Sequence, residues 1–302
     1  MKRILCFVLA IMGIVGNIFA YDFSAVSPSG QTLYYTVSGN NATVTYPGSS
    51  SYYQGYSKPT GTLVIPSSVV YNGIAYVVTS IGEHAFIGCS GLTSVTIPNS
   101  VTSLGEAAFH GCSGLTSVTI SNSIVSIGSS VFKNCTSLTS VTIPDGVTSI
   151  DYSAFYGCSG LTSVTIPNSV TSIGIMTFYG CTGLTSITIP NGVTSIGSFS
   201  FNNCSSLTTI TIPNSIIWIG GYAFNGCSGL TSVTIPNSVT SLGEAAFHGC
   251  SDLTLMYMKP SMPPTLGNAS SICDNIIDLV VPRNSYFAYT NADTNYTRQI
   301  FL

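Results

Sequence analysis

The sequence predicts a repeat solenoid that is mostly β, with short helical or 3₁₀ turns and a β-rich cap at its N-terminal end. Three observations carry this prediction: cysteine recurs every 23 residues, phenylalanine stands three residues before it, and leucine stands three residues after it. A fixed period of 20–50 residues indicates stacked units, because one unit cannot bury its apolar face alone. The periodic cysteines are Cys89, Cys112, Cys135, Cys158, Cys181, Cys204, Cys227, Cys250 and Cys273.

Each unit begins with a short strand. The segment Leu-Thr-Ser-Val-Thr-Ile, at 92–97 for example, is rich in β-branched residues and ends in apolar–polar alternation. Pro98 follows and must end the strand, since proline has no N–H for a ladder. A turn of Asn-Ser, Asn-Gly or Asp-Gly comes next. We expect a second extended piece at Val-Thr-Ser-Ile-Gly and a tight helical or 3₁₀ turn at Ala-Phe-x-Gly-Cys.

The strand pattern matches the leucine-rich-repeat signature. Together with the 23-residue period and the Ile-Pro step, the Ala-Phe-x-Gly-Cys element resembles the BspA-like leucine-rich repeats of bacterial surface proteins. The resemblance covers residues 63–282, about nine coils, and implies a leucine-rich-repeat superhelix. The buried asparagine ladder of commoner repeats is missing, since Ser100, Ser123 and Gly146 stand near its place.

The two ends of the chain depart from the repeat. Residues 21–62 lack it, and 33–37 and 42–46 alternate like strands of a hairpin. We interpret 21–62 as an N-terminal cap rather than a tyrosine-rich contact patch, because a solenoid needs its open edge covered. Residues 283–302 are expected to fold over the other end.

Residues 1–20 have the pattern of a secretory signal peptide. Lys2 and Arg3 precede an apolar run at 4–15, and small residues end at Ala20, where we predict cleavage. The run is too short to span a membrane. A secreted or cell-surface protein with no transmembrane segment after cleavage is therefore expected.

Charge is scarce in this chain. Once Lys2 and Arg3 are removed, five of the seven basic residues remain beside ten acidic residues, which gives a net charge of −5. Charged residues make up 6% of the whole sequence. A nucleic-acid-binding protein would need a basic face, so nucleic-acid partners are excluded. A highly charged disordered chain is excluded as well.

The periodic cysteines allow two interpretations. Exported chains often form disulfides, and equivalent residues of adjacent coils lie close enough for them. However, nine is an odd number, and each cysteine lies between core phenylalanine and leucine positions, where a small buried residue fits. We therefore favour free buried thiols. Equivalent positions cannot converge on one ion, so no metal site is expected.

No catalytic or cofactor-binding constellation stands out. His110 and His248 are copies of each other, because residues 91–113 recur unchanged at 229–251. The Ser-x-x-Lys spacing of Ser130 and Lys133 has no companion motifs. We therefore expect neither an enzyme nor a cofactor.

Two sets of surface residues are candidates for partner binding. The first is a ladder of outward-facing threonines. These residues could instead serve only to stabilise the sheet, because threonine has a high β propensity and pairs well across strands. The ladder comprises Thr93, Thr96, Thr116, Thr119, Thr139, Thr142, Thr162 and Thr165. The second, called the ridge below, occupies positions that vary between units and includes aromatic residues, which suit partner contact. It comprises His110, Lys133, Tyr152, Tyr156, Tyr179, Phe199, Tyr222 and His248.

The resemblance implies a function as well. BspA-like proteins are surface or secreted proteins that bind host matrix proteins or other cells. The expectation is a non-catalytic exported protein for adhesion or protein–protein contact. The alternative is binding of a regular polymer, such as a glycan, by the threonine and serine ladders.

Overall fold

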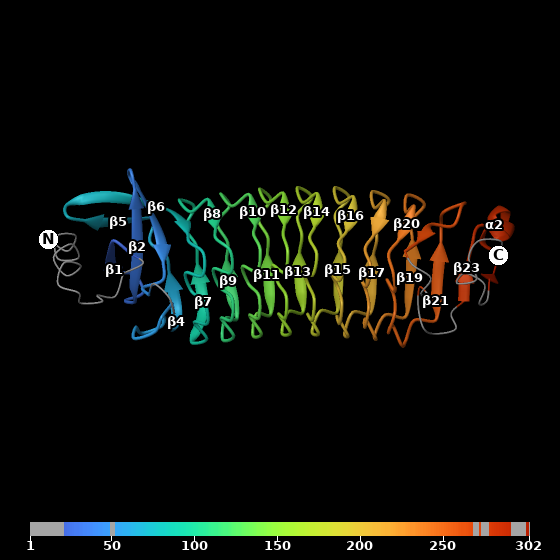
Figure 1. The fold of residues 1–302 in the computed structure, drawn as a ribbon, viewed down its shortest axis with the longest axis horizontal. Helices are drawn as coiled ribbons and strands as arrows, with labels where there is room; N and C mark the ends of the chain where they lie inside the picture. The colour runs from blue at the N-terminus through green and yellow to red at the C-terminus, as the bar shows by residue number, and fades with distance from the viewer. Residues whose placement is uncertain (1–20, 49–51, 268–271, 273–277, 291–299, 302) are drawn as a thin grey trace, which may run out of the picture.

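The computed structural model describes residues 21–48, 52–267, 272, 278–290 and 300–301. The chain forms an elongated stack of coils, with the N-terminal strands at one end and a short helix at the other (Figure 1). The predicted repeat solenoid is confirmed. The predicted signal peptide at 1–20 and Cys273 lie outside the described residues.

The first strand of each coil belongs to a side that we call the long-strand wall. Its strands pair in parallel, and from β7 to β23 the paired residues are 23 apart, as Ser140 pairs with Ser163. Most of them end one residue before the Ile-Pro step, as the proline predicts. The strands are β4 (Gly61–Val64), β7 (Leu92–Thr96), β9 (Ser117–Thr119), β11 (Ser140–Thr142), β13 (Ser163–Thr165), β15 (Ser186–Thr188), β17 (Thr209–Thr211), β19 (Ser232–Ile235), β21 (Leu255–Met258), β23 (Asp278–Val280) and β24 (Ile300–Phe301).

The predicted second extended piece forms the short-strand wall, which lies in the upper half of Figure 1. These strands contain two residues each, the first turned outward and the second toward the core in most coils. The strands are β8 (Ser103–Leu104), β10 (Ser126–Ile127), β12 (Ser149–Ile150), β14 (Ser172–Ile173), β16 (Ser195–Ile196), β18 (Trp218–Ile219), β20 (Ser241–Leu242) and β22 (Thr265–Leu266).

The residues between the two walls, Gly82–Cys89 and their equivalents, form what we call the corner segments. The predicted helical or 3₁₀ turn is wrong for them. Their N–H groups alternate: those of Ile87 and Cys89 bond back three residues, whereas those of Phe86 and Gly88 bond across to carbonyls of the next coil. Every second donor therefore leaves the local turn, which prevents a helix and ties neighbouring coils together.

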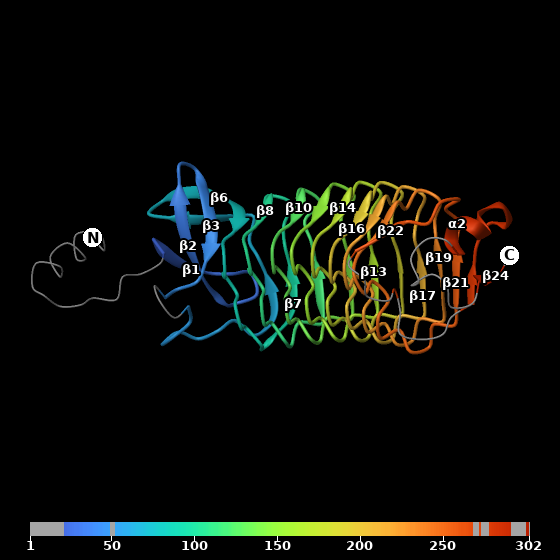
Figure 2. The ribbon, with the colours of Figure 1, turned by 45° about the vertical axis from the view of Figure 1, so that its right-hand side comes forward.

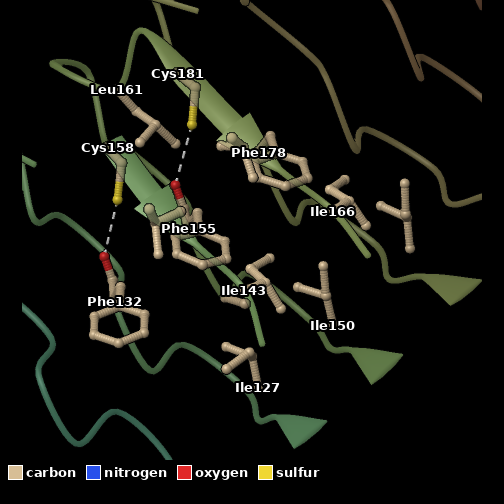
Figure 3. Packing of buried hydrophobic residues seen from close by; sticks show 14 of the residues in the cluster. Ile127, Phe132, Ile143, Ile150, Phe155, Cys158, Leu161, Ile166, Phe178 and Cys181 are labelled. Carbon is tan, nitrogen blue, oxygen red and sulfur yellow. Dashed lines mark hydrogen bonds between the residues drawn. The ribbon is translucent and has the colours of Figure 1, made fainter. Parts of the chain in front are cut away.

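Phenylalanine and cysteine form the central columns of the core (Figure 3). The phenylalanines from Phe86 to Phe247 are fully buried, and successive ring centroids lie 5.1–5.5 Å apart in stacked geometry. The apolar strand residues fill the space between these columns and the two walls. Each coil therefore buries its apolar side against its neighbours rather than within itself.

The N-terminal end is covered by a sheet whose strand β6 also pairs with β8 of the short-strand wall. Its strands run in the order β1-β2-β3-β6-β5, and β2 and β3 form the predicted hairpin. The strands are β1 (Phe23–Val26), β2 (Thr32–Ser38), β3 (Asn41–Thr45), β5 (Ser68–Tyr71) and β6 (Ile74–Ile81). Tyr35 and Tyr53 are buried, and the Tyr53 hydroxyl donates to the carbonyl of Ala85 in the first corner segment at 2.7 Å. These contacts hold the N-terminal residues against the first coil, and β5 and β6 extend the covering sheet beyond residue 62.

The other end carries a short 3₁₀ turn, η1 (Arg283–Ser285), and helix α2 (Tyr286–Thr290), visible at the right of Figure 2. Tyr289 is fully buried, and its hydroxyl donates to the Pro260 carbonyl at 2.9 Å. The helix therefore docks on the end of the stack.

Candidate functional site

The cysteine column is structural. The eight described cysteines are free and buried. From Cys112 to Cys250, each thiol donates to the carbonyl of the phenylalanine in the preceding coil, at 3.0–3.2 Å between sulfur and oxygen. Burial raises the pKa of Cys158 and Cys204 to about 12. A thiol held protonated at neutral pH is neither a nucleophile nor a metal ligand.

The ridge residues all lie on the corner segments, but the structure divides them into small stacks. Lys133, Tyr156 and Tyr179 occupy the same place in three successive coils. The Lys133 ammonium nitrogen lies 4.8 Å from the Tyr156 ring centroid, and the Tyr156 and Tyr179 rings stack at 4.7 Å, 2° from parallel. The three side chains are partly buried and restrict one another's motion through these contacts.

A second aromatic stack lies three places earlier along the corner segment. Phe199 and Tyr222 stack with centroids 4.9 Å apart. The Tyr222 hydroxyl donates to Glu244 at 3.1 Å, and this hydrogen bond raises the pKa of the phenol. Both residues have positive φ, 59° and 56°, as do their equivalents in the other coils. The left-handed backbone places these side chains outside the core.

The remaining ridge residues lie at its two ends or beside it. Tyr152 is 48% exposed, and its hydroxyl lies 3.7 Å from the Met176 sulfur. His110 is partly buried, and burial, followed by the nearby charge of Lys133, lowers its pKa. It is therefore a neutral imidazole at physiological pH. His248 is exposed, and its Nδ1 lies 2.9 Å from the amide nitrogen of Asn225.

The column of Lys133, Tyr156 and Tyr179 continues into a residue that is buried. Asn202, the next in the column of Tyr156 and Tyr179, is only 4% exposed. Its amide donates to the Asn225 side chain at 3.1 Å, so Asn202, Asn225 and His248 continue the column as a polar ladder. The sequence gives a signal for it, because amide side chains one period apart can pair between coils.

The threonine ladder consists of two columns with different roles. Members of the first column donate their hydroxyls to the backbone: Thr116 to the Thr93 carbonyl at 2.9 Å, Thr139 to Thr116 at 3.5 Å, and Thr162 to Thr139 at 3.0 Å. The second column, Thr96, Thr119, Thr142 and Thr165, is exposed, and its hydroxyls have no hydrogen bond within the described part of the chain. Only the second column leaves its hydroxyl donors to solvent.

Sequence reasoning missed the apolar residues on the outer face of the short-strand wall. Val125 is 60% exposed, Ile217 53% and Trp218 38%. They replace threonine or serine of the Val-Thr-Ser-Ile step, and the replacement of Ser by Trp was the available signal.

A metal site needs several ligands close together, and a helical membrane span needs a long apolar segment. Across the residues that the structure describes, no three His, Cys, Asp or Glu side chains gather closely enough to hold an ion. Within the same part of the chain, no helix has the length and apolar character of a membrane span.

Comparison with known proteins agrees with this architecture. The BspA type leucine rich repeat region matches residues 67–185 and 173–293. A leucine-rich repeat protein from Bacteroides ovatus is 28% identical, with a TM-score of 0.65, over 86% of this chain and 71% of its own. A leucine rich cell surface protein from Faecalibacterium prausnitzii is 27% identical, with a TM-score of 0.50, over 87% and 86%.

No curated protein sequence matches the chain. The family match covers most of the chain, and the similar solved structures share the same repeat architecture. The protein is therefore a member of the BspA-type leucine-rich-repeat family.

Proposed function

We propose that this protein is a non-catalytic, exported repeat protein that mediates adhesion or protein–protein contact at the bacterial cell surface. The observation that carries the proposal is the ridge, where Lys133, Tyr156 and Tyr179 form a pre-ordered stack on a rigid solenoid. Side chains already held in place lose little entropy on binding, and tyrosine is enriched among the residues that carry most of the binding energy of protein interfaces.

The surface around the ridge is suited to protein contact. The chain carries little charge, so attraction to a partner depends on aromatic and hydrogen-bonding groups rather than on a strong field. The similarity to a leucine rich cell surface protein supports the proposed location. The same proposal includes cleavage of a signal peptide after Ala20. It also divides the chain into a cap at 21–62, repeats at 63–282 and a tail at 283–302.

Partners can be found by screening the secreted protein against immobilised matrix proteins and against a glycan panel. For a captured protein partner, Tyr156→Ala with Tyr179→Ala should weaken binding at least tenfold. Because the two rings stack on each other, we also expect the free energy of unfolding of this variant to be about 1–2 kcal/mol lower than that of the natural protein. Binding is therefore compared well below the thermal midpoint of the variant.

The matched control is Thr142→Ala with Thr165→Ala on the long-strand wall, where both residues are exposed. This control should bind the partner as the natural protein does. Equal binding by the ridge variant and the natural protein would remove the ridge from the proposal.

Binding of a regular polymer remains the second candidate. It would use the column of Thr96, Thr119, Thr142 and Thr165, whose exposed hydroxyls repeat once per coil. Capture confined to glycans, and abolished by the Thr142→Ala and Thr165→Ala control, would favour this function over the first.

A further inference from the structure

Ile217 and Trp218 form an apolar island in the outer face of the short-strand wall. Trp218 pairs with Ser195 on one side and Ser241 on the other, and it is the only tryptophan of the chain. Ile217 lies between Thr194 and Thr240, with backbone hydrogen bonds of 2.9 Å to both. The island therefore occupies a single coil, and serine and threonine border it on both sides.

The strand segments that border the island on its own wall carry no charge. The three neighbouring segments that lead to this wall, 189–197, 212–220 and 235–243, contain no Asp, Glu, Lys, Arg or His. The charged residue Glu244 begins the corner segment that directly follows 235–243, and none of the three segments holds a basic residue, so an anionic ligand would find no counter-ion in them. The groups available around the indole are hydroxyls and amides, which bond a neutral polar ligand.

Trp218 differs from the ridge aromatics in what covers its ring. Each of the rings of Tyr156, Tyr179, Phe199 and Tyr222 has a face engaged in a stack. No described ring stacks on Trp218, and within the described residues its indole N–H donates to no acceptor. A 38% exposed indole thus offers both a ring surface and a free donor.

The fold does not need tryptophan at this position. Serine takes the equivalent place at Ser195 and Ser241 in coils of the same geometry. With serine on both sides, Trp218 also has no aromatic cross-strand partner, the contact that stabilises exposed aromatics in sheets. A contribution to the stability of the fold therefore does not explain why tryptophan occupies this position.

We propose that Ile217 and Trp218 form a stacking site for a neutral sugar ring. The C–H groups on one face of a pyranose carry slight positive charge and meet the negative face of the indole. Its hydroxyls can accept from the indole N–H and bond the serine and threonine hydroxyls of the adjacent coils. The ridge is not required for this binding.

The small size of the island favours a sugar over a protein as its ligand. A stable protein interface buries about 800 Å² on each partner around an apolar core of several residues. Here the next exposed apolar side chain of this wall, Val125, lies four coils away. Two side chains in one coil match the face of one sugar ring.

The single tryptophan makes the test direct. We would titrate the natural chain with neutral oligosaccharides of glucose, N-acetylglucosamine, mannose and galactose while following tryptophan fluorescence. We expect a saturable shift of the emission to shorter wavelength with at least one of them, with a Kd on the order of 1 mM or below. A shift arising only from protein concentration, or only from a protein partner, would overturn the proposal.

The variant Ile217→Thr with Trp218→Ser restores the residues of the neighbouring coils, so it should fold. By calorimetry it should lose the sugar binding at least tenfold, whereas Trp218→Phe should keep part of it. The ridge variant Tyr156→Ala with Tyr179→Ala should bind the sugar normally. Undiminished sugar binding by the serine variant, or no shift with any of the sugars, would contradict the assignment.

Discussion

At the scale of single residues, the cysteine of each coil is explained by its carbonyl partner. The phenylalanine carbonyl accepts the N–H of the cysteine in its own coil and the thiol of the cysteine in the next, as Phe155 does from Cys158 and Cys181. A thiol is small enough for the buried site and supplies the donor, which alanine would not. The constancy of this position therefore reflects packing between coils rather than chemistry.

Buried thiols predict that the protein unfolds at alkaline pH. Burial raises the pKa of Cys158 and Cys204 from 9.0 to about 12. Because the folded state keeps the proton that the unfolded chain releases, their contribution to stability is complete below pH 9 and is lost as the pH rises toward 12. Each thiol should lower the free energy of unfolding by about 1.4 kcal/mol per pH unit in that window.

The measurement is the urea midpoint at several pH values from 7 to 10.5. The control variant Cys158→Ala with Cys204→Ala should be less stable at pH 7 and depend less steeply on pH above 9. A midpoint that stays constant from pH 7 to 10.5 would show that the thiols are not buried as described.

At the scale of elements, the corner segment depends on two left-handed residues per coil. One is glycine in most coils, such as Gly180 with φ of 70°, and asparagine at Asn134 and Asn203 with φ of 58° and 59°. The other is a non-glycine residue throughout, for example Ala107 with φ of 52°. These two positions bend the chain so that alternate N–H groups reach the next coil.

Gly180→Ala should therefore lower the free energy of unfolding by about 1 kcal/mol. A Cβ at this position would lie 3.8 Å from the Gly157 Cα, so backbone conformation rather than a clash causes the loss. Ala107→Gly is the reverse change at the other left-handed position and should alter stability by no more than about 0.5 kcal/mol. Equilibrium urea unfolding compares both with the natural chain, and equal losses for the two variants would refute this account of the corner.

At the scale of the whole molecule, the sequence predicted the architecture because one 23-residue pattern repeats through it. The period fixed the coil stacking, and Pro98 and its equivalents fixed where strands end. The helical turn was mispredicted because Ala-Phe-x-Gly-Cys has no local signal showing that alternate N–H groups bond to another coil. That partner lies 22 residues away, as from Phe86 to Ala108.

The candidate surfaces were predicted less completely. Variation between coils located Tyr156 and Tyr179, but their stacking depends on the coil spacing and could not be read from either unit alone. Trp218 was not predicted as a candidate residue, because its neighbours Ile216 and Ile219 match the core pattern of the repeat. Residues that depart from the repeat are therefore found best by comparing equivalent positions of successive coils.

The central claim is that the repeat supplies a scaffold and that the ridge residues recognise the partner. It is tested most directly by replacing Lys133, Tyr156 and Tyr179 together with asparagine, the residue that the same column carries at Asn202 and Asn225. Affinity for a captured protein partner is then measured on the folded variant. The account predicts that binding is lost while the coil structure, followed by circular dichroism, is retained. Undiminished partner binding by this folded variant would contradict it.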